Sequence, residues 1–172
     1  ALGSTALLFT DGSFSPAAVR EKTALFGTSS PSYLLMASID WARAYLTEGA
    51  GGAAYRAVAA ETARLRAQIN KRGVFRALCE ADGVSLDPTR LTVDTGRAGL
   101  SGDQAGKHLE QDYNIWPEMT DRDRVVCILT CADTAEELER LGAAFAALEQ
   151  FAAAAPFRPC PPPPAPRMRR RI

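Results

Sequence analysis

Apolar residues recur at helical spacing through the first 72 positions and predict three helices, at residues 16–26, 32–46 and 53–72. Ser15-Pro16 is a typical start for the first helix, since serine caps the free amides and proline suits the first helical position. Gly27 and Gly73 are expected to end the first and third helices. Before these helices, a short apolar run at 6–9 predicts a strand.

The second of these helices, at 32–46, has apolar residues around most of its circumference. A helix on the surface of a domain shows a single apolar stripe, whereas apolar residues on several sides indicate burial on several sides. We therefore expect a larger body of protein around this helix.

The region after the third helix mixes short strands with helices. The pattern predicts strands at 91–95, 115–119 and 125–129, and helices at 74–80, 101–113 and from Thr134 to about residue 154. Thr134 and Glu137 form a capping-box pattern at the start of the last helix, while Pro117 interrupts the second strand. The fold class predicted is α+β, with helices packed on a small sheet.

The last segment, 156–172, holds seven of the eleven prolines of the chain and four arginines in its final six residues. Proline-rich sequence favours an extended conformation, so this segment is predicted to be a Pro/Arg-rich linker. An arginine cluster of this kind also suits a phosphate or an acidic partner.

Composition narrows the function classes. The chain has 172 residues, 47% of them hydrophobic, with 20 basic and 20 acidic side chains, which argues against disorder throughout and against a nucleic-acid binder. No apolar run approaches the roughly 20 residues that cross a membrane, and no leader pattern suggests export. The four cysteines match neither a zinc-site nor a disulfide spacing, and Cys127 and Cys131 are expected to be buried thiols. A cytoplasmic location is predicted.

Few residues suit catalysis. The single histidine, His108, lies in a predicted helix and is interpreted as a surface residue rather than a general base. The sequence lacks the common phosphate-loop, dinucleotide, zinc-protease and serine-hydrolase motifs.

Three consecutive hydroxyl residues, Thr28, Ser29 and Ser30, precede Pro31 and the second helix. The start of a helix offers unpaired N–H groups and a partial positive charge, so this turn suits a phosphate group. The alternative is an ordinary N-cap in which Ser30 accepts from amides of the first turn.

The segment at 25–43, with the sequence LFGTSSPSYLLMASIDWAR, resembles the bacterial ornithine/lysine/arginine decarboxylases. Further segments resemble that family in the same order, at 87–94, 99–102, 113–119 and 129–134. The family consists of pyridoxal-phosphate (PLP) enzymes with the aspartate-aminotransferase type of fold (fold type I). The resemblance implies a division of the chain into the end of the large PLP-binding domain (1–48), the small C-terminal α+β domain (49–155) and the linker (156–172).

The resemblance also implies that the Schiff-base lysine of the family would precede Ala1. Lys22, Lys71 and Lys107 lie in predicted helices and outside the family's lysine motif. The chain is thus expected to be a fragment of a decarboxylase and inactive by itself. A stand-alone binding or regulatory module derived from the same family is the alternative.

Site residues follow only from the resemblance. It places Thr28, Ser29 and Ser30 at the cofactor phosphate of a neighbouring subunit, which implies a homo-oligomer, as in the family dimer. It places Glu118 near the distal amine of a basic amino-acid substrate, while a surface glutamate beside a proline is the alternative for this residue. The adjacent Trp116-Pro117 pair departs from the family pattern.

Overall fold

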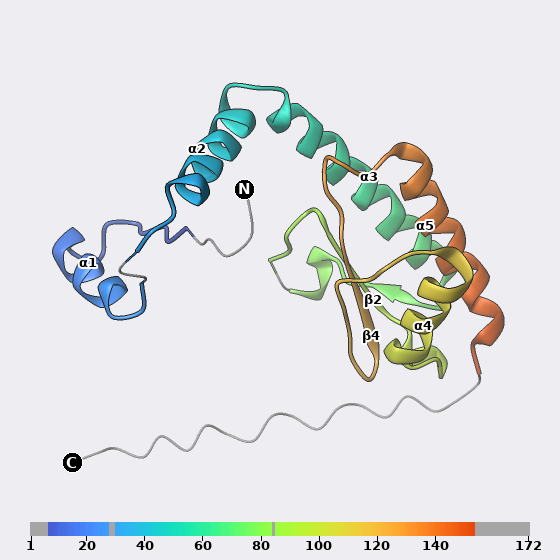
Figure 1. Ribbon diagram of the computed structural model, residues 1–172. Helices are drawn as coiled ribbons and strands as arrows, with labels where there is room; N and C mark the ends of the chain where they lie inside the picture. Colours follow the sequence, from blue (N-terminus) through green and yellow to red (C-terminus); the bar gives the residue numbers. More distant parts are fainter. Residues whose placement is uncertain (1–6, 28–29, 84, 154–172) are drawn as a thin grey trace, which may run out of the picture. The chain divides into compact units, whose positions relative to one another are not determined.

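The computed structural model describes residues 7–27, 30–83 and 85–153. By its contacts the chain divides into two units, Ala1–Ala54 and Tyr55–Ile172. Figure 1 shows the helices and strands of both units, coloured in the order in which they follow one another along the chain.

The first unit contains two helices that begin as predicted. Helix α1 (Pro16–Ala24) has Ser15 as N-cap, whose side chain accepts from the amide of Ala18. Helix α2 covers Tyr33–Thr47, within one residue of the prediction. The strand predicted at 6–9 is wrong for residues 7–9, which are not in a sheet, because they pair with no second strand among the described residues.

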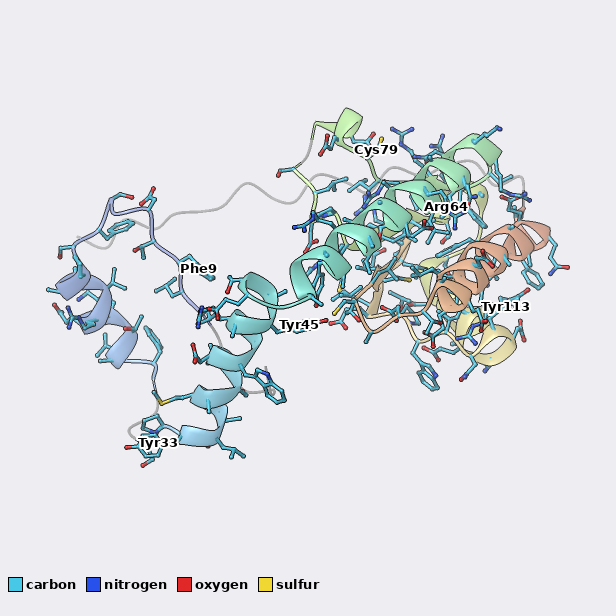
Figure 2. The ribbon with its side chains drawn as sticks, turned by 90° about the horizontal axis from the view of Figure 1, so that it is seen from above. Phe9, Tyr33, Tyr45, Arg64, Cys79 and Tyr113 are labelled. Atoms are coloured by element: carbon cyan, nitrogen blue, oxygen red, sulfur yellow. The ribbon has the colours of Figure 1, made fainter. Side chains whose placement is uncertain are left out.

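Residues 7–27 and 30–50 of this unit include no buried residue. Tyr33 and Trp41 on α2 are 83% and 78% exposed, and Figure 2 shows Tyr33 at one end of the helix and Tyr45 near the other. The sequence predicted burial on several sides, and the described residues provide no such cover for α2. Much of its apolar surface is exposed in this structure.

Helix α3 (Gly51–Arg72) carries the amphipathic pattern predicted for 53–72. Val58, Leu65 and Ile69 are buried along one face. Gly73 follows with φ of +78°, a left-handed conformation that glycine adopts without steric cost, and so ends the helix.

Four strands form an antiparallel sheet in the order β1-β2-β4-β3. Their bounds are Arg76–Ala77 (β1), Arg90–Asp94 (β2), Met119–Thr120 (β3) and Arg124–Ile128 (β4). The central pair aligns Leu91 with Cys127 and Val93 with Val125, so buried side chains share one face of the sheet. Of the strand predicted at 115–119, only Met119 lies in a strand, at the start of β3 after Pro117.

The helix predicted at 74–80 is wrong. This stretch contains β1 and the start of the 3₁₀ helix η1 (Glu80–Asp82). Leu78 donates its amide to the carbonyl of Thr92 at 2.9 Å, so the backbone of this stretch continues the pairing with β2. Pairing with a neighbouring strand decides the conformation of so short an apolar segment.

Two further helices complete the second unit, α4 (Gly102–Tyr113) and α5 (Ala135–Leu148). The capping box of Thr134 and Glu137 is confirmed, and Ser101 with Gln104 forms another at the start of α4. Helix α5 ends before the predicted residue 154, in the 3₁₀ helix η3 (Glu149–Phe151). A further 3₁₀ helix, η2 (Gly96–Ala98), follows β2.

The core lies between one face of the sheet and helices α3, α4 and α5. Its largest fully buried side chains come from helices and strands alike: Phe145, Leu65, Leu91, Leu109, Leu148, Val93 and Val125. The prediction of an α+β fold with helices on a small sheet is confirmed, whereas its origin in a fold-type-I enzyme stays a prediction.

Cys127 is buried in this core, and burial raises the pKa of its thiol to about 12, because the thiolate would lose its hydration there. Its prediction as a buried thiol is confirmed, while Cys131 is half-buried. Among the described residues, no helix combines the length and the apolar character needed to cross a membrane.

Candidate functional site

Two of the three residues predicted to hold a phosphate, Thr28 and Ser29, lie outside the described residues. Ser30 is exposed, as are Gly27 and Pro31 on either side of the turn. The N-cap of α2 is Ser32, whose hydroxyl accepts from the amide of Leu35 at 3.5 Å. The alternative that made Ser30 the cap is therefore wrong, because the helix begins two residues further along.

The start of α2 is accessible to an anion. Ser32 already satisfies the amides of Leu35 and Met36, the latter through its carbonyl at 3.0 Å. The first amides of a helix have no acceptor within the helix, and in α2 they lie at an exposed end of the helix. These donors fit the chemistry of a phosphate, although Ser30 itself has a polar interaction within the protein.

Glu118 lies in the second unit, in the turn that enters β3. Its amide donates to the carbonyl of Val126 at 2.9 Å, which attaches this turn to β4. The side chain is exposed and lines a cavity of about 260 Å³. The other lining residues are Asn114, Ile115, Trp116, Cys127, Ile128, Leu129, Asp133, Glu137, Leu138, Arg140 and Leu141.

The carboxylates around this cavity differ in their partners. Asp133 accepts from the amide of Thr130 at 2.5 Å, and Glu137 accepts from the amide and hydroxyl of Thr134 at 2.8 and 2.9 Å. Glu118 has no hydrogen-bond or ion-pair partner for its carboxylate within the part of the chain that the structure describes. It is thus the acidic group of this cavity that remains available to a cationic ligand.

The charge around the cavity is net negative, with three carboxylates and the guanidinium of Arg140. The pKa of Glu137 is lowered by hydrogen bonds from the backbone and side chain of Thr134 and, less strongly, by the charge of Arg140. The cavity therefore favours a cation over an anion.

By sequence Trp116 is only a departure from the family pattern, but the structure places it on the wall of the same cavity. Its side chain is 75% exposed, and its Nε1 donates to Oδ1 of Asn114 at 3.4 Å. Asn114 caps the end of α4 with φ of +52°, in the left-handed region that asparagine tolerates better than most residues. A helix-ending asparagine before Trp-Pro was the available sequence signal for this turn.

His108 is half-buried rather than a plain surface residue. Its Nδ1 lies 2.8 Å from Oδ2 of Asp112, one helical turn further along α4. The imidazole stacks on Phe151, with ring centroids 4.1 Å apart and planes inclined by 13°. These contacts attach η3 to α4 and give His108 a structural role.

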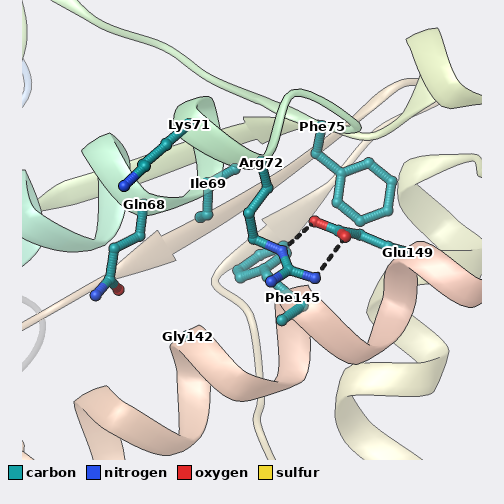
Figure 3. Close-up of a pocket in the computed structure, with 9 residues that line it drawn as sticks. Gln68, Ile69, Lys71, Arg72, Phe75, Gly142, Phe145 and Glu149 are labelled. Carbon is teal, nitrogen blue, oxygen red and sulfur yellow. Dashed lines mark hydrogen bonds and ion pairs between the residues drawn. The ribbon is translucent and has the colours of Figure 1, made fainter.

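A second cavity, of about 330 Å³, lies between α3 and α5. Phe75 and Phe145 form part of its apolar wall, and Arg72 makes a bidentate ion pair with Glu149, with both N–O distances at 2.7 Å (Figure 3). The hydrogen bonds and charge of Glu149 raise the pKa of Arg72. Both charged groups are occupied with each other, so this cavity offers an apolar surface rather than a site for acid–base chemistry.

Comparison with known proteins identified relatives of one kind. The chain is 33% identical to arginine decarboxylase of Bacillus subtilis (strain 168) over 157 residues, which cover 86% of this chain and 31% of the relative. It is 31% identical to arginine decarboxylase of Bacillus anthracis over 136 residues, which cover 73% of this chain and 26% of the relative. For arginine decarboxylase of Halalkalibacterium halodurans the identity is 33% over 137 residues, which cover 76% of this chain and 28% of the relative.

The chain thus spans about three tenths of the length of these curated relatives. No protein-family model matches it, and no solved structure does. The chain is related to arginine decarboxylases over most of its own length, which confirms the resemblance at the level of a decarboxylase-related family.

Proposed function

We propose that this chain is part of a pyridoxal-phosphate-dependent decarboxylase that acts on a basic amino acid, with arginine first among lysine, ornithine and arginine. The similarity to arginine decarboxylases over most of the chain supports the reaction and the substrate class. The short coverage of those relatives supports the proposal that the chain is a fragment of a longer enzyme.

The observation that carries this proposal is the position of Glu118. Its carboxylate lacks a partner among the described residues and lines a small cavity whose charge is net negative. In the proposed enzyme Glu118 binds the cationic end of the substrate and so orients the amino acid for loss of its carboxylate.

The turn at 28–30 has the second role in the proposal. Thr28, Ser29 and Ser30 would hold the phosphate of the cofactor bound by a neighbouring subunit, and the exposed start of α2 supports this role. The cofactor, when bound, supplies the electron sink for decarboxylation. A homodimer is part of this proposal, because the turn would serve the site of the other subunit.

We further propose that the chain by itself is inactive. Lys22, Lys71 and Lys107 are exposed residues of α1, α3 and α4, and none of them lines the cavity of Glu118. An amine that binds the cofactor covalently would then come from another part of the enzyme.

The second unit has a core of its own, and this observation favours a second candidate, a stand-alone binding or regulatory module. The mass of the polypeptide in its source cells distinguishes the two. Detection with an antibody against residues 55–153 should reveal a protein roughly three times as long as this chain, as in the relatives. A protein of about 18.4 kDa would instead favour the module.

The longer protein then allows a test of the reaction and of Glu118. With added cofactor it should release carbon dioxide from arginine, and Glu118→Gln should raise KM by about tenfold or more, because a charge-assisted contact is lost. Glu139→Gln removes the same charge from an exposed position of α5 outside the cavity and serves as the control. Absence of carbon dioxide release from all three basic amino acids would refute the proposed function.

A further inference from the structure

Trp116 and Glu118 line one cavity from the same short turn between α4 and β3. An indole that is 75% exposed loses the benefit of burial, and large exposed aromatic side chains beside a cavity are typical of binding surfaces. The indole Nε1 donates to Oδ1 of Asn114, and Pro117 restricts the backbone conformation of Trp116.

The carboxylates of this cavity attract a guanidinium and a primary ammonium alike, since both carry one positive charge. Glu118, Asp133 and Glu137 therefore select for charge and not for shape, and Arg140 repels both kinds of cation. A preference between them has to come from a group that distinguishes a flat, weakly hydrated cation from a compact, strongly hydrated one.

We propose that Trp116 is a specificity-determining residue that makes the Glu118 cavity prefer a guanidinium to a primary ammonium. The indole face stacks on the planar guanidinium while Glu118 accepts its N–H groups. A cavity of about 260 Å³ lies below the size of drug-binding pockets and suits a single side chain. This inference rests on the proposed function, because it refines the choice of substrate at the same site.

Binding to the 172-residue chain tests the inference without any need for catalysis. Because Trp41 is the other tryptophan, a Trp41→Phe background leaves Trp116 as the fluorescent reporter. Agmatine and cadaverine are the probes, with a guanidinium and an ammonium at the distal end. Agmatine should quench the fluorescence with a Kd about fivefold or more below that of cadaverine.

Three variants distinguish the role of Trp116 from that of Glu118, with calorimetry as the common measurement. Trp116→Leu should reduce the preference for agmatine to within about twofold, and Trp116→Phe should retain part of it because a phenyl ring also stacks on a cation. Glu118→Gln should weaken the binding of both probes by similar factors and leave the preference for agmatine unchanged.

Equal affinities for the two probes, a preference unchanged in Trp116→Leu, or no binding of either probe would overturn the inference. If the parent protein binds agmatine and cadaverine equally and Glu118→Gln weakens the binding of both, the role of Trp116 is overturned. The proposed function then still stands. If Glu118→Gln changes the affinity for neither probe and agmatine is still preferred, the result supports the role of Trp116. It contradicts the proposed role of Glu118.

Discussion

Glu137 couples helix capping to protonation. Its carboxylate accepts from the amide and hydroxyl of Thr134 at the start of α5, and these bonds lower its pKa. A carboxyl with a lower pKa in the folded state than in the unfolded state stabilises the fold above its unfolded pKa. That contribution to stability is lost as the pH falls through the pKa of Glu137 in the folded state.

We expect Glu137→Gln to weaken the pH dependence of stability. The free energy of unfolding of the parent chain should decrease between about pH 6 and pH 3, and the variant should show a smaller decrease over the same range. Urea unfolding at a series of pH values measures the difference. Glu139→Gln, with the same charge change on the exposed side of α5, should follow the parent curve.

Between elements, Asn70 attaches α3 to the edge of the sheet. Its Nδ2 donates to the carbonyl of Ala77 at 2.9 Å, and its Oδ1 accepts from the amide of Ala77 at 2.8 Å. The side chain thus acts as an additional strand partner for β1, whose other edge pairs with β2. Ala77 is fully buried, so water cannot replace these bonds.

Asn70→Ala should therefore lower the free energy of unfolding by about 2 kcal/mol, since it leaves a buried amide and a buried carbonyl unpaired. Chemical denaturation of the purified chain measures this change. Lys71→Ala, at the next and exposed position of α3, should alter stability by less than about 0.5 kcal/mol. Equal effects of the two substitutions would show that the Asn70 bonds contribute little.

At the scale of the whole molecule, stability is concentrated in the second unit. All buried hydrophobic residues of the described chain lie there, from Val58 in α3 to Leu148 in α5. The described residues of the first unit before α3 are all exposed or half-buried. Burial of apolar surface is the main favourable contribution to folding, so the second unit contains within itself the residues that stabilise its fold.

Deletion of residues 1–50 should accordingly leave a single cooperative thermal transition, with Tm within about 3 °C of that of the complete chain. The binding of a hydrophobic dye should decrease, because the apolar surface of α2 is removed. Circular dichroism and dye fluorescence give the two readings. A Tm lower by about 10 °C would show that the first unit stabilises the second.

Local patterns along the chain determined where α1, α4 and α5 begin. Ser15-Pro16, Ser101 and the Thr134–Glu137 capping box act on amides within the same turn, so the sequence alone specifies these sites. The family resemblance likewise singled out Glu118. That resemblance rests on short motifs in the order of the family, and the comparison with known proteins supports it at the level of related proteins.

Only the tertiary structure decided which segments paired and which residues met. Residues 76–77 became a strand because Asp94, Val93 and Asn70 supply partners from elsewhere in the chain. Trp116 gained a candidate role because α5 brings Glu137 and Arg140 to the cavity that it lines with Glu118. Such contacts depend on residues distant in sequence, and no local preference of the backbone encodes them.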